Sequence, residues 1–455
     1  MILPFSKGNK YLLTAALAVS LLVGAQPVSH TSAAATTTAA KEISSAEFAA
    51  FLKDKFNVAL PARITRGEFI LDLAASVRLE PADAPVTFAD LPSSSPYYDA
   101  ANTLYKNGVL ASDTVNSSAS LTAINAVQLS VRAAGLKELA ASYPQAKAEL
   151  AIAKLPIRAD KLNLQTRQEL AAAVDTGLLP SAYYNQLKSG AGVTADLANV
   201  LIGKTLVFRG QYKHYIGSVS DPDIYAKLTD AYNASVIIRS DKLQKVVDAA
   251  LEQGLVTGYN LKDSRYEPNF IESLTLVYGH SDLKHAIQLI GLLRSEGIDA
   301  KVQFEPKTSA FVYLKEWGDP GVSDQYEVRQ IANGNYIEYA KEYDIAFEFN
   351  QSADKNRFNE IISTYAKKNK EDQPGLIANS WWQPLYYSLT ALPDYKIITN
   401  NKITADRYYA QSFSLKEQSQ AVIDGFKKVD PSVTVEHYDF WTDVPFYNYL
   451  NGESL

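Results

Sequence analysis

The stretch Thr65-Arg66-Gly67-Glu68-Phe69 starts an apolar run that extends to Val77. A threonine that caps a helix, followed three residues later by a glutamate that reaches back to the amide of the cap, forms a reciprocal capping box. The stretch therefore predicts a helix that begins at Arg66. The capping box accounts for Thr65 and Glu68 but needs no arginine. A guanidinium beside a helix N-terminus suits a carboxylate or phosphate ligand, so two interpretations stay open: a cap alone, or a cap with an added ligand role.

The chain before this helix has the pattern of an exported protein. Lys7 and Lys10 precede an apolar stretch at 11–25 that is short and rich in small residues, as in a secretory signal peptide. We interpret residues 1–25 as a cleaved signal peptide and residues 26–42 as a flexible spacer. An uncleaved anchor is the alternative for the first segment. No later stretch is apolar over a membrane-spanning length, so we expect no integral membrane anchor.

The composition is that of a globular, disulfide-free protein. With 455 residues, 47% of them apolar, the chain is long enough for roughly two to four packed domains. It contains no cysteine, so its stability must come from packed cores. A net charge of −6 argues against a nucleic-acid partner, because phosphate groups need a basic face. The 28 tyrosines suit contact with carbohydrate or protein, although tyrosine also fills strands.

Patterns of helix, turn and helix follow one another up to about residue 204. The second pattern starts at Phe88-Ala89-Asp90-Leu91-Pro92, and the third, weaker one starts with a helix at 169–179. Glycine after a helix adopts the left-handed conformation that ends it, which predicts a helix stop at Gly108. The three patterns close with helices led by Thr65, Thr122 and Thr194. Short repeats of this kind cannot bury their own apolar faces and must pack together.

This order of motifs resembles the S-layer homology repeat, whose pattern runs from Phe-x-Asp through an aromatic residue, a helix and a glycine to a Thr-Arg-Ala-Glu helix. The first copy is partial, the second spans Phe88 to Leu136 and the third is degenerate. The resemblance implies an all-α helical repeat bundle at residues 43–204. In the family, grooves between the lobes bind a pyruvylated secondary polymer of the Gram-positive cell wall.

The resemblance also implies a set of polymer-binding residues in this chain. A carboxylate on a sugar ring suits the planar fork of an arginine. The arginine is absent after Thr122 and Thr194, and Tyr97 replaces the usual tryptophan, so we expect one strong groove near Arg66. Asp90 and Gly108 have structural explanations as well, as a turn cap and a helix stop. The implied binding residues are Arg66, Thr65, Glu68, Asp90, Tyr97 and Gly108.

The remainder of the chain, residues 205–455, alternates strand and helix patterns. A strand at 274–278, a helix at 282–296 and strands at 299–304 and 310–314 form a βαββ unit. Later strands at 343–349 and 408–413 each lead into a helix. We therefore expect an α+β region of ferredoxin-like units, with two subdomains at 205–330 and 331–455. The predicted fold class is thus multidomain, with an all-α part followed by an α+β part.

No catalytic motif is present in this second region. His280 and His285 are five residues apart and do not share a helix face, so we predict no metal site and no cofactor. Carboxylates at Glu338, Glu342, Asp344 and Glu348 could pair for glycoside hydrolysis, but solvated faces explain them better. The most ligand-like cluster is Trp381, Trp382 and Tyr386, which suits stacking on sugars or on another protein. A buried aromatic hub is the alternative.

Together these patterns predict a protein of the extracellular cell surface rather than an enzyme. We expect its repeats to bind secondary cell-wall polysaccharide and its C-terminal region to serve as an S-layer-type or interaction module, through self-association or contact with other surface proteins. Two alternatives stay open for that region. The first alternative is a polysaccharide-active enzyme, and the second is a binding protein for an extracellular glycan or solute.

Overall fold

The computed structural model describes residues 42–188, 190–365 and 385–453. The predicted signal peptide and all of the spacer but its last residue lie outside the described residues, as do Trp381 and Trp382. Residues 43–455 belong to one compact unit. Within the described part of the chain, no helix combines the length and apolarity needed to cross a membrane.

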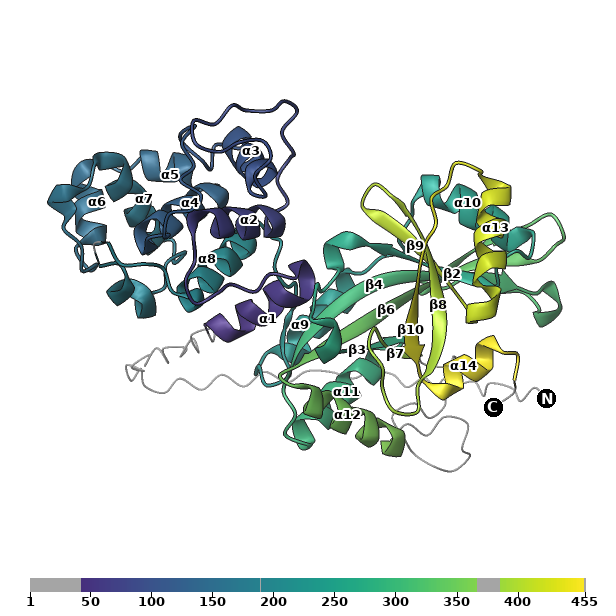
Figure 1. Cartoon of the computed structure of the whole chain (residues 1–455). Helices are drawn as coiled ribbons and strands as arrows, with labels where there is room; N and C mark the ends of the chain where they lie inside the picture. The colour runs from purple at the N-terminus through teal and green to yellow at the C-terminus, as the bar shows by residue number, and fades with distance from the viewer. Residues whose placement is uncertain (1–41, 189, 366–384, 454–455) are drawn as a thin grey trace, which may run out of the picture. The chain divides into compact units, whose positions relative to one another are not determined.

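The first part of this unit is helical and packs around one apolar core (Figure 1). Phe48, Phe69 and Leu201 are fully buried in it. Several helices begin at a side-chain cap that the sequence supplies, such as Ser44 before the first. The helices are α1 Ser45–Phe56, α2 Arg66–Ser76, α3 Tyr98–Lys106, α4 Ala123–Ala133, α5 Lys137–Ala141, α6 Gln145–Ile152, α7 Leu164–Asp175 and α8 Ala195–Phe208.

Among the described residues, the second part contains ten strands and the helices that cover them. The strands are β1 Gly217–Ser218, β2 Gly258–Asp263, β3 Thr275–His280, β4 Ala300–Tyr313, β5 Tyr326–Gln330, β6 Tyr336–Phe349, β7 Leu385–Ser388, β8 Lys396–Ala405, β9 Tyr408–Ser414 and β10 Glu436–Thr442. The helices are α9 Ile224–Ala234, α10 Asp241–Glu252, α11 Leu283–Ser295, α12 Ser352–Tyr365, α13 Ser419–Val429 and α14 Val444–Leu450.

Eight of these strands close into an antiparallel barrel. The order around the barrel is β4-β2-β9-β8-β10-β7-β3-β6, and β6 pairs with β4 to complete the circle. The pairing of β4 with β6 is the longest, since it runs from Ala300 opposite Phe349 to Tyr313 opposite Tyr336. Strands β1 and β5 are extra and pair with β4 and β6. Closure removes the exposed edges that an open sheet would leave.

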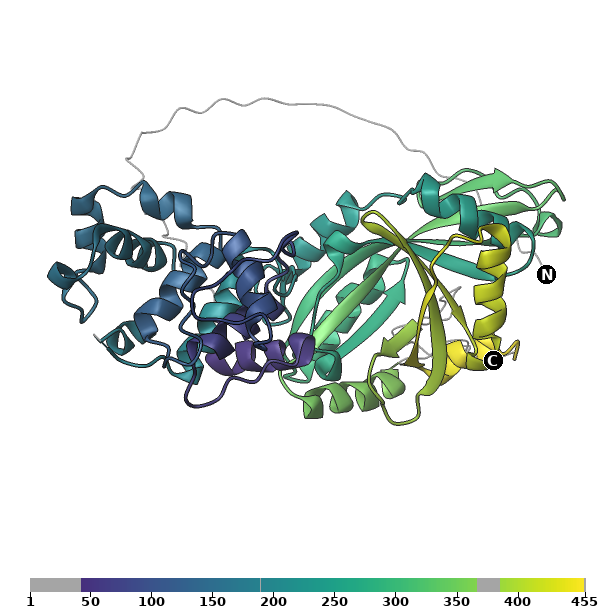
Figure 2. The ribbon, with the colours of Figure 1, turned by 45° about the horizontal axis from the view of Figure 1, so that its top comes forward.

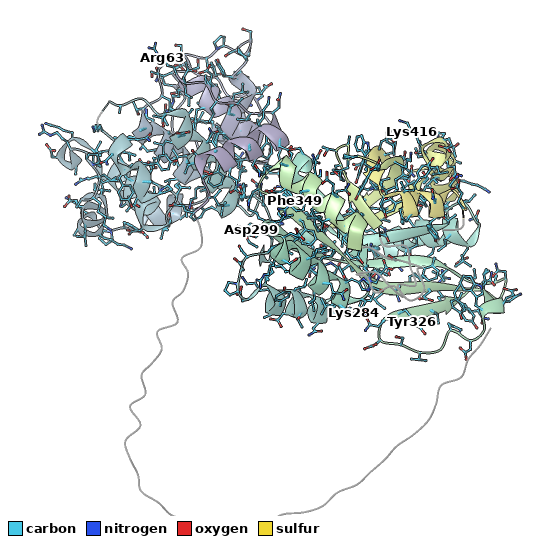
Figure 3. The ribbon with its side chains drawn as sticks, turned by 90° about the horizontal axis from the view of Figure 1, so that it is seen from below. Arg63, Lys284, Asp299, Tyr326, Phe349 and Lys416 are labelled. Atoms are coloured by element: carbon cyan, nitrogen blue, oxygen red, sulfur yellow. The ribbon has the colours of Figure 1, made fainter. Side chains whose placement is uncertain are left out.

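Helices cover the outside of the barrel (Figures 1 and 2), and many apolar side chains of the strands pack against them. The odd-numbered positions of β6 from Tyr343 to Phe349 pack with α9, α11 and α12. Phe349, labelled in Figure 3, lies with its ring 5.5 Å from that of Phe358 in α12. On another side of the barrel, Leu261 and Ile403 pack against α10 and α13. Because side chains alternate along a strand, the positions between these apolar ones face the interior of the barrel.

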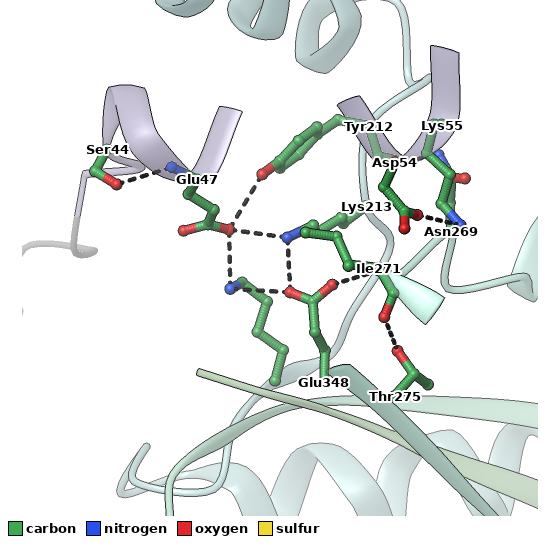
Figure 4. Close-up of polar contacts among 11 residues, drawn as sticks. Ser44, Glu47, Asp54, Lys55, Tyr212, Lys213, Asn269, Ile271, Thr275 and Glu348 are labelled. Carbon is green, nitrogen blue, oxygen red and sulfur yellow. Dashed lines mark hydrogen bonds and ion pairs between the residues drawn. The ribbon is translucent and has the colours of Figure 1, made fainter. Parts of the chain in front are cut away.

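A charged network connects α1 to the barrel (Figure 4). Glu47 of α1 accepts a hydrogen bond from Tyr212 at 3.1 Å and pairs with Lys213 at 3.2 Å and Lys301 at 2.9 Å. Lys213 also pairs with Glu348 of β6 at 2.6 Å. The side chain of Lys213 is fully buried, so both carboxylates are needed to offset its desolvation.

The predicted fold class is wrong. An all-α bundle followed by ferredoxin-like βαββ units does not describe a structure that is built on a closed eight-stranded antiparallel barrel with extra strands and many helices. The two predicted strands at 299–304 and 310–314 are one strand, β4, and β2 and β8 had no predicted counterpart. The predicted boundary at residues 204 and 205 falls inside α8, which extends to Phe208. The barrel takes strands from both sides of residue 330, so a division there does not describe it.

Candidate functional site

Thr65 and Glu68 form the predicted capping box at the start of α2. The hydroxyl of Thr65 accepts a hydrogen bond from the amide of Glu68 at 3.2 Å. The Glu68 carboxylate in turn accepts from the Thr65 amide at 2.7 Å and from its hydroxyl at 2.8 Å. Both side chains therefore have a structural role that accounts for their presence.

Arg66 is half-buried and only partly satisfied by the protein. Its Nε donates to the carbonyl of Val115 at 2.8 Å, and its two terminal nitrogens have no acceptor among the described residues. Burial lowers the pKa of the Arg66 guanidinium, and the nearby Arg132 lowers it further, while Asp90 opposes both. Arg132 is itself engaged in a two-point pair with Glu169, at 2.7 and 3.0 Å. The end of the Arg66 guanidinium thus remains available to an anion.

Asp90 and Tyr97 meet Arg66 at the loop formed by residues 115–119. The two oxygens of Asp90 accept from the amides of Val115 at 2.7 Å and Asn116 at 2.6 Å, so Asp90 fixes the shape of this loop. The ring of Tyr97 lies so close to Gly67 that a Cβ there would be 2.8 Å from it. Gly108 lies apart from this group, as the left-handed stop of α3 with φ of 69°.

The three threonine-led helices begin in one repeated arrangement. The residues before the three threonines are connected by backbone hydrogen bonds, from Leu121 N to Ile64 O at 3.0 Å and from Val193 N to Leu121 O at 2.9 Å. The residues after the first two threonines repeat a second bond, from Arg66 N to Ala119 O at 2.9 Å and from Ala123 N to Ala191 O at 3.0 Å. The first two helix starts are therefore each joined to the segment that leads into the next threonine-led helix, in the same register.

The interior of the barrel, which we call the lumen, is lined mainly by polar and charged side chains, together with an apolar cluster that includes Ile398, Phe413 and Phe440. In β4 and β6 these side chains occupy alternate positions, between the outward apolar ones. A structural core is normally apolar, and buried charges cost several kcal/mol each unless they are paired. The inward positions include Lys262, Lys301, Gln303, Glu305, Lys307, Glu338, Glu342, Asp344, Glu348, Tyr387, Tyr409 and Gln411.

A charged layer crosses the middle of the lumen and consists of Lys262, Glu305, Lys307, Glu342 and Asp344. Asp344 lies at its centre, 2.5 Å from Lys262 and 2.7 Å from Lys307. Burial by itself raises the pKa of Asp344, but the two lysines outweigh this effect and hold the pKa at about 2. Burial raises the pKa of Glu305 to about 7, although Lys262 lies 3.4 Å away. The carboxylate of Asp344 is thus ionised at neutral pH, whereas that of Glu305 is partly protonated.

Two cavities lie on opposite sides of the charged layer. The first has a volume of about 510 Å³ and is lined by Lys262, Glu305, Tyr387, Tyr409 and Gln411, with Lys402 and Arg78 among its outer residues. The second has a volume of about 560 Å³ and is lined by Asn260, Lys307, Ser309 and Glu342 and by the rings of Phe311, Phe413, Phe446 and Tyr449. Gln411 contributes to both. Each cavity has the size of a small-molecule site.

Tyr386 does not form the predicted stacking surface. It is 3% exposed and lies on the outer side of β7, with its ring 4.7 Å from that of Tyr278. The alternative interpretation, a buried aromatic hub, describes this residue. Its neighbour Tyr387 faces the lumen instead and lines the first cavity.

The two histidines are stacked, but they belong to no larger cluster of metal-binding side chains. The ring centroids of His280 and His285 are 4.1 Å apart. Within the described ranges, no group of three or more His, Cys, Asp or Glu residues could hold a metal ion. Burial lowers the pKa of His285, which favours its neutral form.

The charged residues of the lumen were not predicted as a site from the sequence. Glu342, Asp344 and Glu348 are inward-facing and paired with lysines, instead of lying on a solvated face. The signal that could have found them is the match between two lysines of β4 and two glutamates of β6, since Lys301 lies opposite Glu348 and Lys307 opposite Glu342, whereas Glu305 lies opposite the like charge of Asp344. Opposite charges directly across two strands stabilise their pairing.

Searches against protein-family models and against curated proteins found no match to this sequence.

Proposed function

We propose that the chain is an exported surface protein held non-covalently to the cell wall by residues 43–204, through a pyruvylated secondary polymer. The observation that carries the proposal is the repeated register of the helices led by Thr65, Thr122 and Thr194. Three sequence-distant segments that share one bonding pattern are typical of a repeat unit that has been copied. This pattern agrees with the resemblance to S-layer homology repeats.

Arg66 is the residue that we assign to the anionic sugar. Its terminal nitrogens have no acceptor among the described residues, and Arg132 adds positive charge close by. A carboxylate ketal would accept two parallel hydrogen bonds from such a fork. The corresponding positions after Thr122 and Thr194 are alanines, so the proposal places the strongest contact in one groove.

Replacing Arg66 with alanine should weaken binding to the wall polymer by roughly tenfold or more, because a hydrogen bond to a charged group contributes about 1.5–3 kcal/mol. The measurement is co-sedimentation with sacculi that carry the polymer, with stripped sacculi as the background. Arg66→Lys keeps the charge but not the fork and should bind with intermediate strength.

Arg63→Ala is the matched control, since Arg63 is an exposed arginine three residues away (Figure 3). It should sediment like the unchanged protein. Because Arg66 also donates to Val115, the melting temperature of each variant has to be recorded alongside. If Arg66→Ala and the unchanged protein sedimented equally, Arg66 would have a structural role only and would not bind the polymer.

For the barrel, the polar lumen favours a second function, the binding of a small solute or glycan. A barrel without a ligand would be more stable with an apolar interior, because buried ion pairs are often no better than well-packed hydrophobic residues. Here the two larger apolar clusters lie between the strands and the helices, and the lumen keeps many polar side chains around two cavities of about 510 and 560 Å³. Such an arrangement suits a ligand that is held by polar groups.

A ligand in the lumen should be sensitive to Gln411, which lines both cavities. We expect ligand-observed NMR with a panel of sugars, amino acids, nucleosides and amines to find a binder whose affinity falls at least fivefold in Gln411→Leu. The exposed Gln420→Leu variant should leave the affinity unchanged. If no compound of the panel binds, or if the affinity of the binder is the same in Gln411→Leu, the proposal that the lumen binds a ligand is wrong.

A further inference from the structure

We propose that the second cavity binds an organic cation, namely an ammonium group attached to an apolar or aromatic body. The inference rests on the proposal that the lumen binds a ligand, and it adds the chemical class of that ligand. Two features of the cavity support it: a carboxylate, Glu342, whose charge the protein offsets only in part, and a wall of aromatic rings. A second buried carboxylate, Glu338, lies beside the first on the same face of β6.

Carboxylates outnumber lysines around the charged layer. Two lysines, Lys262 and Lys307, face four carboxylates: Glu305, Glu338, Glu342 and Asp344. Asp344 takes the closest contact of both lysines, at 2.5 and 2.7 Å, whereas Glu342 is 3.6 Å from Lys307. Glu342 also accepts a hydrogen bond from the hydroxyl of Ser309, which carries no charge. The negative charge of Glu342 is therefore only partly offset by the protein. A buried charge in excess is costly, and a cation of opposite sign would lower that cost.

Glu338 is the carboxylate without a partner. It is 7% exposed and makes no hydrogen bond or ion pair with any described residue. It lies on the same face of β6 as Glu342, four positions earlier, and opposite Phe311 of β4. Burial raises the pKa of Glu338, and the charge of Glu342 raises it further. Glu338 does not line the second cavity, but it adds a second buried carboxyl group beside Glu342, and neighbouring acidic groups favour a cation between or near them.

Aromatic rings form the wall of the same cavity. Phe311, Phe413, Phe446 and Tyr449 line it, and Trp317 stands among the lining residues while being more than half exposed. The charge of Glu342 reaches this wall, since it raises the pKa of Tyr449 in addition to the effect of burial. The faces of aromatic rings attract cations, and such contacts contribute about 0.5–2 kcal/mol. The rings also exclude a small, strongly hydrated inorganic cation as the best ligand.

An anion would fit this cavity poorly. Lys307 is the one lysine among its lining residues, and the ammonium of Lys307 is already held by Asp344 at 2.7 Å. An incoming carboxylate would compete with Asp344 and lie close to Glu342. The first cavity differs in this respect, because Lys402 and Arg78 are among its outer residues.

The experiment compares three probes of one shape: 2-phenylethylammonium, 2-phenylethanol and 3-phenylpropionate. Their affinities for the whole protein are measured by isothermal titration calorimetry. The ammonium should bind at least tenfold more tightly than the alcohol, and the carboxylate more weakly than the alcohol. Glu342→Gln should bring the ammonium to the affinity of the alcohol and leave the alcohol unchanged. Phe413→Leu should weaken both, and the exposed Glu417→Gln should change neither.

The outcomes separate this inference from the proposal on which it rests. Equal affinity for the three probes, a preference for the carboxylate, or an ammonium preference that survives Glu342→Gln overturns the organic cation as the ligand. Absence of binding by all three probes overturns it as well. In each of these cases the lumen proposal is decided separately, by the solute panel and the response to Gln411→Leu. Thermal melts of the variants show that each remains folded.

Discussion

Replacing Asp344 with alanine is expected to lower the free energy of unfolding by about 3–5 kcal/mol, the usual cost of removing one partner from a buried ion pair. Asp344 is 3% exposed and contacts both lysines of the charged layer, so the substitution leaves two buried ammonium groups without their closest partner. Glu305 and Glu342 offset part of the loss, at 3.4 and 3.6 Å from the lysines. Urea denaturation measures the change.

The same substitution should alter the pH dependence of stability. Asp344 has its pKa held at about 2, below the ordinary 3.8, so its stabilising contribution is present above about pH 4 and is lost as the pH falls toward 2. Asp344→Ala should therefore lack this part of the acid sensitivity. The exposed Asp424→Ala is the control and should change stability by less than about 0.5 kcal/mol. A loss below about 1 kcal/mol for Asp344→Ala would mean that the lumen is hydrated enough to solvate both lysines.

A variant without the charged layer distinguishes a structural role of these charges from a functional one. Replacing Asp344 with leucine, both lysines with methionine, and Glu305 and Glu342 with glutamine removes all five charges together, and removal of a whole buried ionic network is often neutral or stabilising by about 1–4 kcal/mol. A stable variant of this kind that no longer binds solute would show that the charges serve the ligand. If the variant is as unstable as Asp344→Ala, the charges serve the fold.

The local features of this chain could be predicted from its sequence. The capping box at Thr65 and the helix stop at Gly108 depend on residues within one or two turns of each other, so their chemistry is visible in the chain. Strand and helix alternation in the second half was visible for the same reason. These features set where elements begin and end, and they do not determine how distant elements pair.

The barrel could not be predicted, because its closure depends on the pairing of β4 with β6 and on two strands with weak sequence signals. β2 has polar residues at alternate positions, and β8 contains a polar run at 399–402. Alternation of polar and apolar residues predicts a strand with two different faces. It does not tell whether the polar face meets bulk water or lines a closed lumen. The charges of β6 were therefore taken for a solvated face, and only the complementary charges of β4 distinguish the two cases.

The same limit applies to the candidate site. Arg66 was predicted as a ligand-binding residue because a helix cap does not require an arginine. Its contacts with the loop at 115–119 depend on how the first repeat packs against the second. The aromatic wall of the second cavity combines Phe311, Phe413 and Phe446 from three separate elements. No spacing in the sequence brings these residues together, so the cavity emerges only from the tertiary structure.

Gly203→Ala is expected to destabilise the helical region by about 1–3 kcal/mol or more, although alanine is the better helix former. Gly203 lies in α8 against α1, and a Cβ there would be 2.0 Å from Cδ1 of Phe48. Phe48 has no exposed surface and packs on Tyr212 with ring centroids 5.2 Å apart, so it has no free space into which to move. The helices α1 and α8 would have to separate. Urea denaturation followed by circular dichroism at 222 nm measures the loss.

Gly291→Ala is the matched control, because Gly291 also lies within a helix, α11, but a Cβ there meets only the hydroxyl of Tyr225 at an ordinary 3.7 Å. This variant should be as stable as the unchanged protein or more stable by about 0.4–1 kcal/mol, since alanine restricts the unfolded chain. Because the two substitutions are expected to change the free energy of unfolding in opposite directions, comparing them separates the contact with Phe48 from the effect of helix propensity. If Gly203→Ala proved as stable as Gly291→Ala, α1 would be loosely held on α8. The network of Glu47, Lys213 and Glu348 would then have to hold α1 to the barrel with little support from this packing.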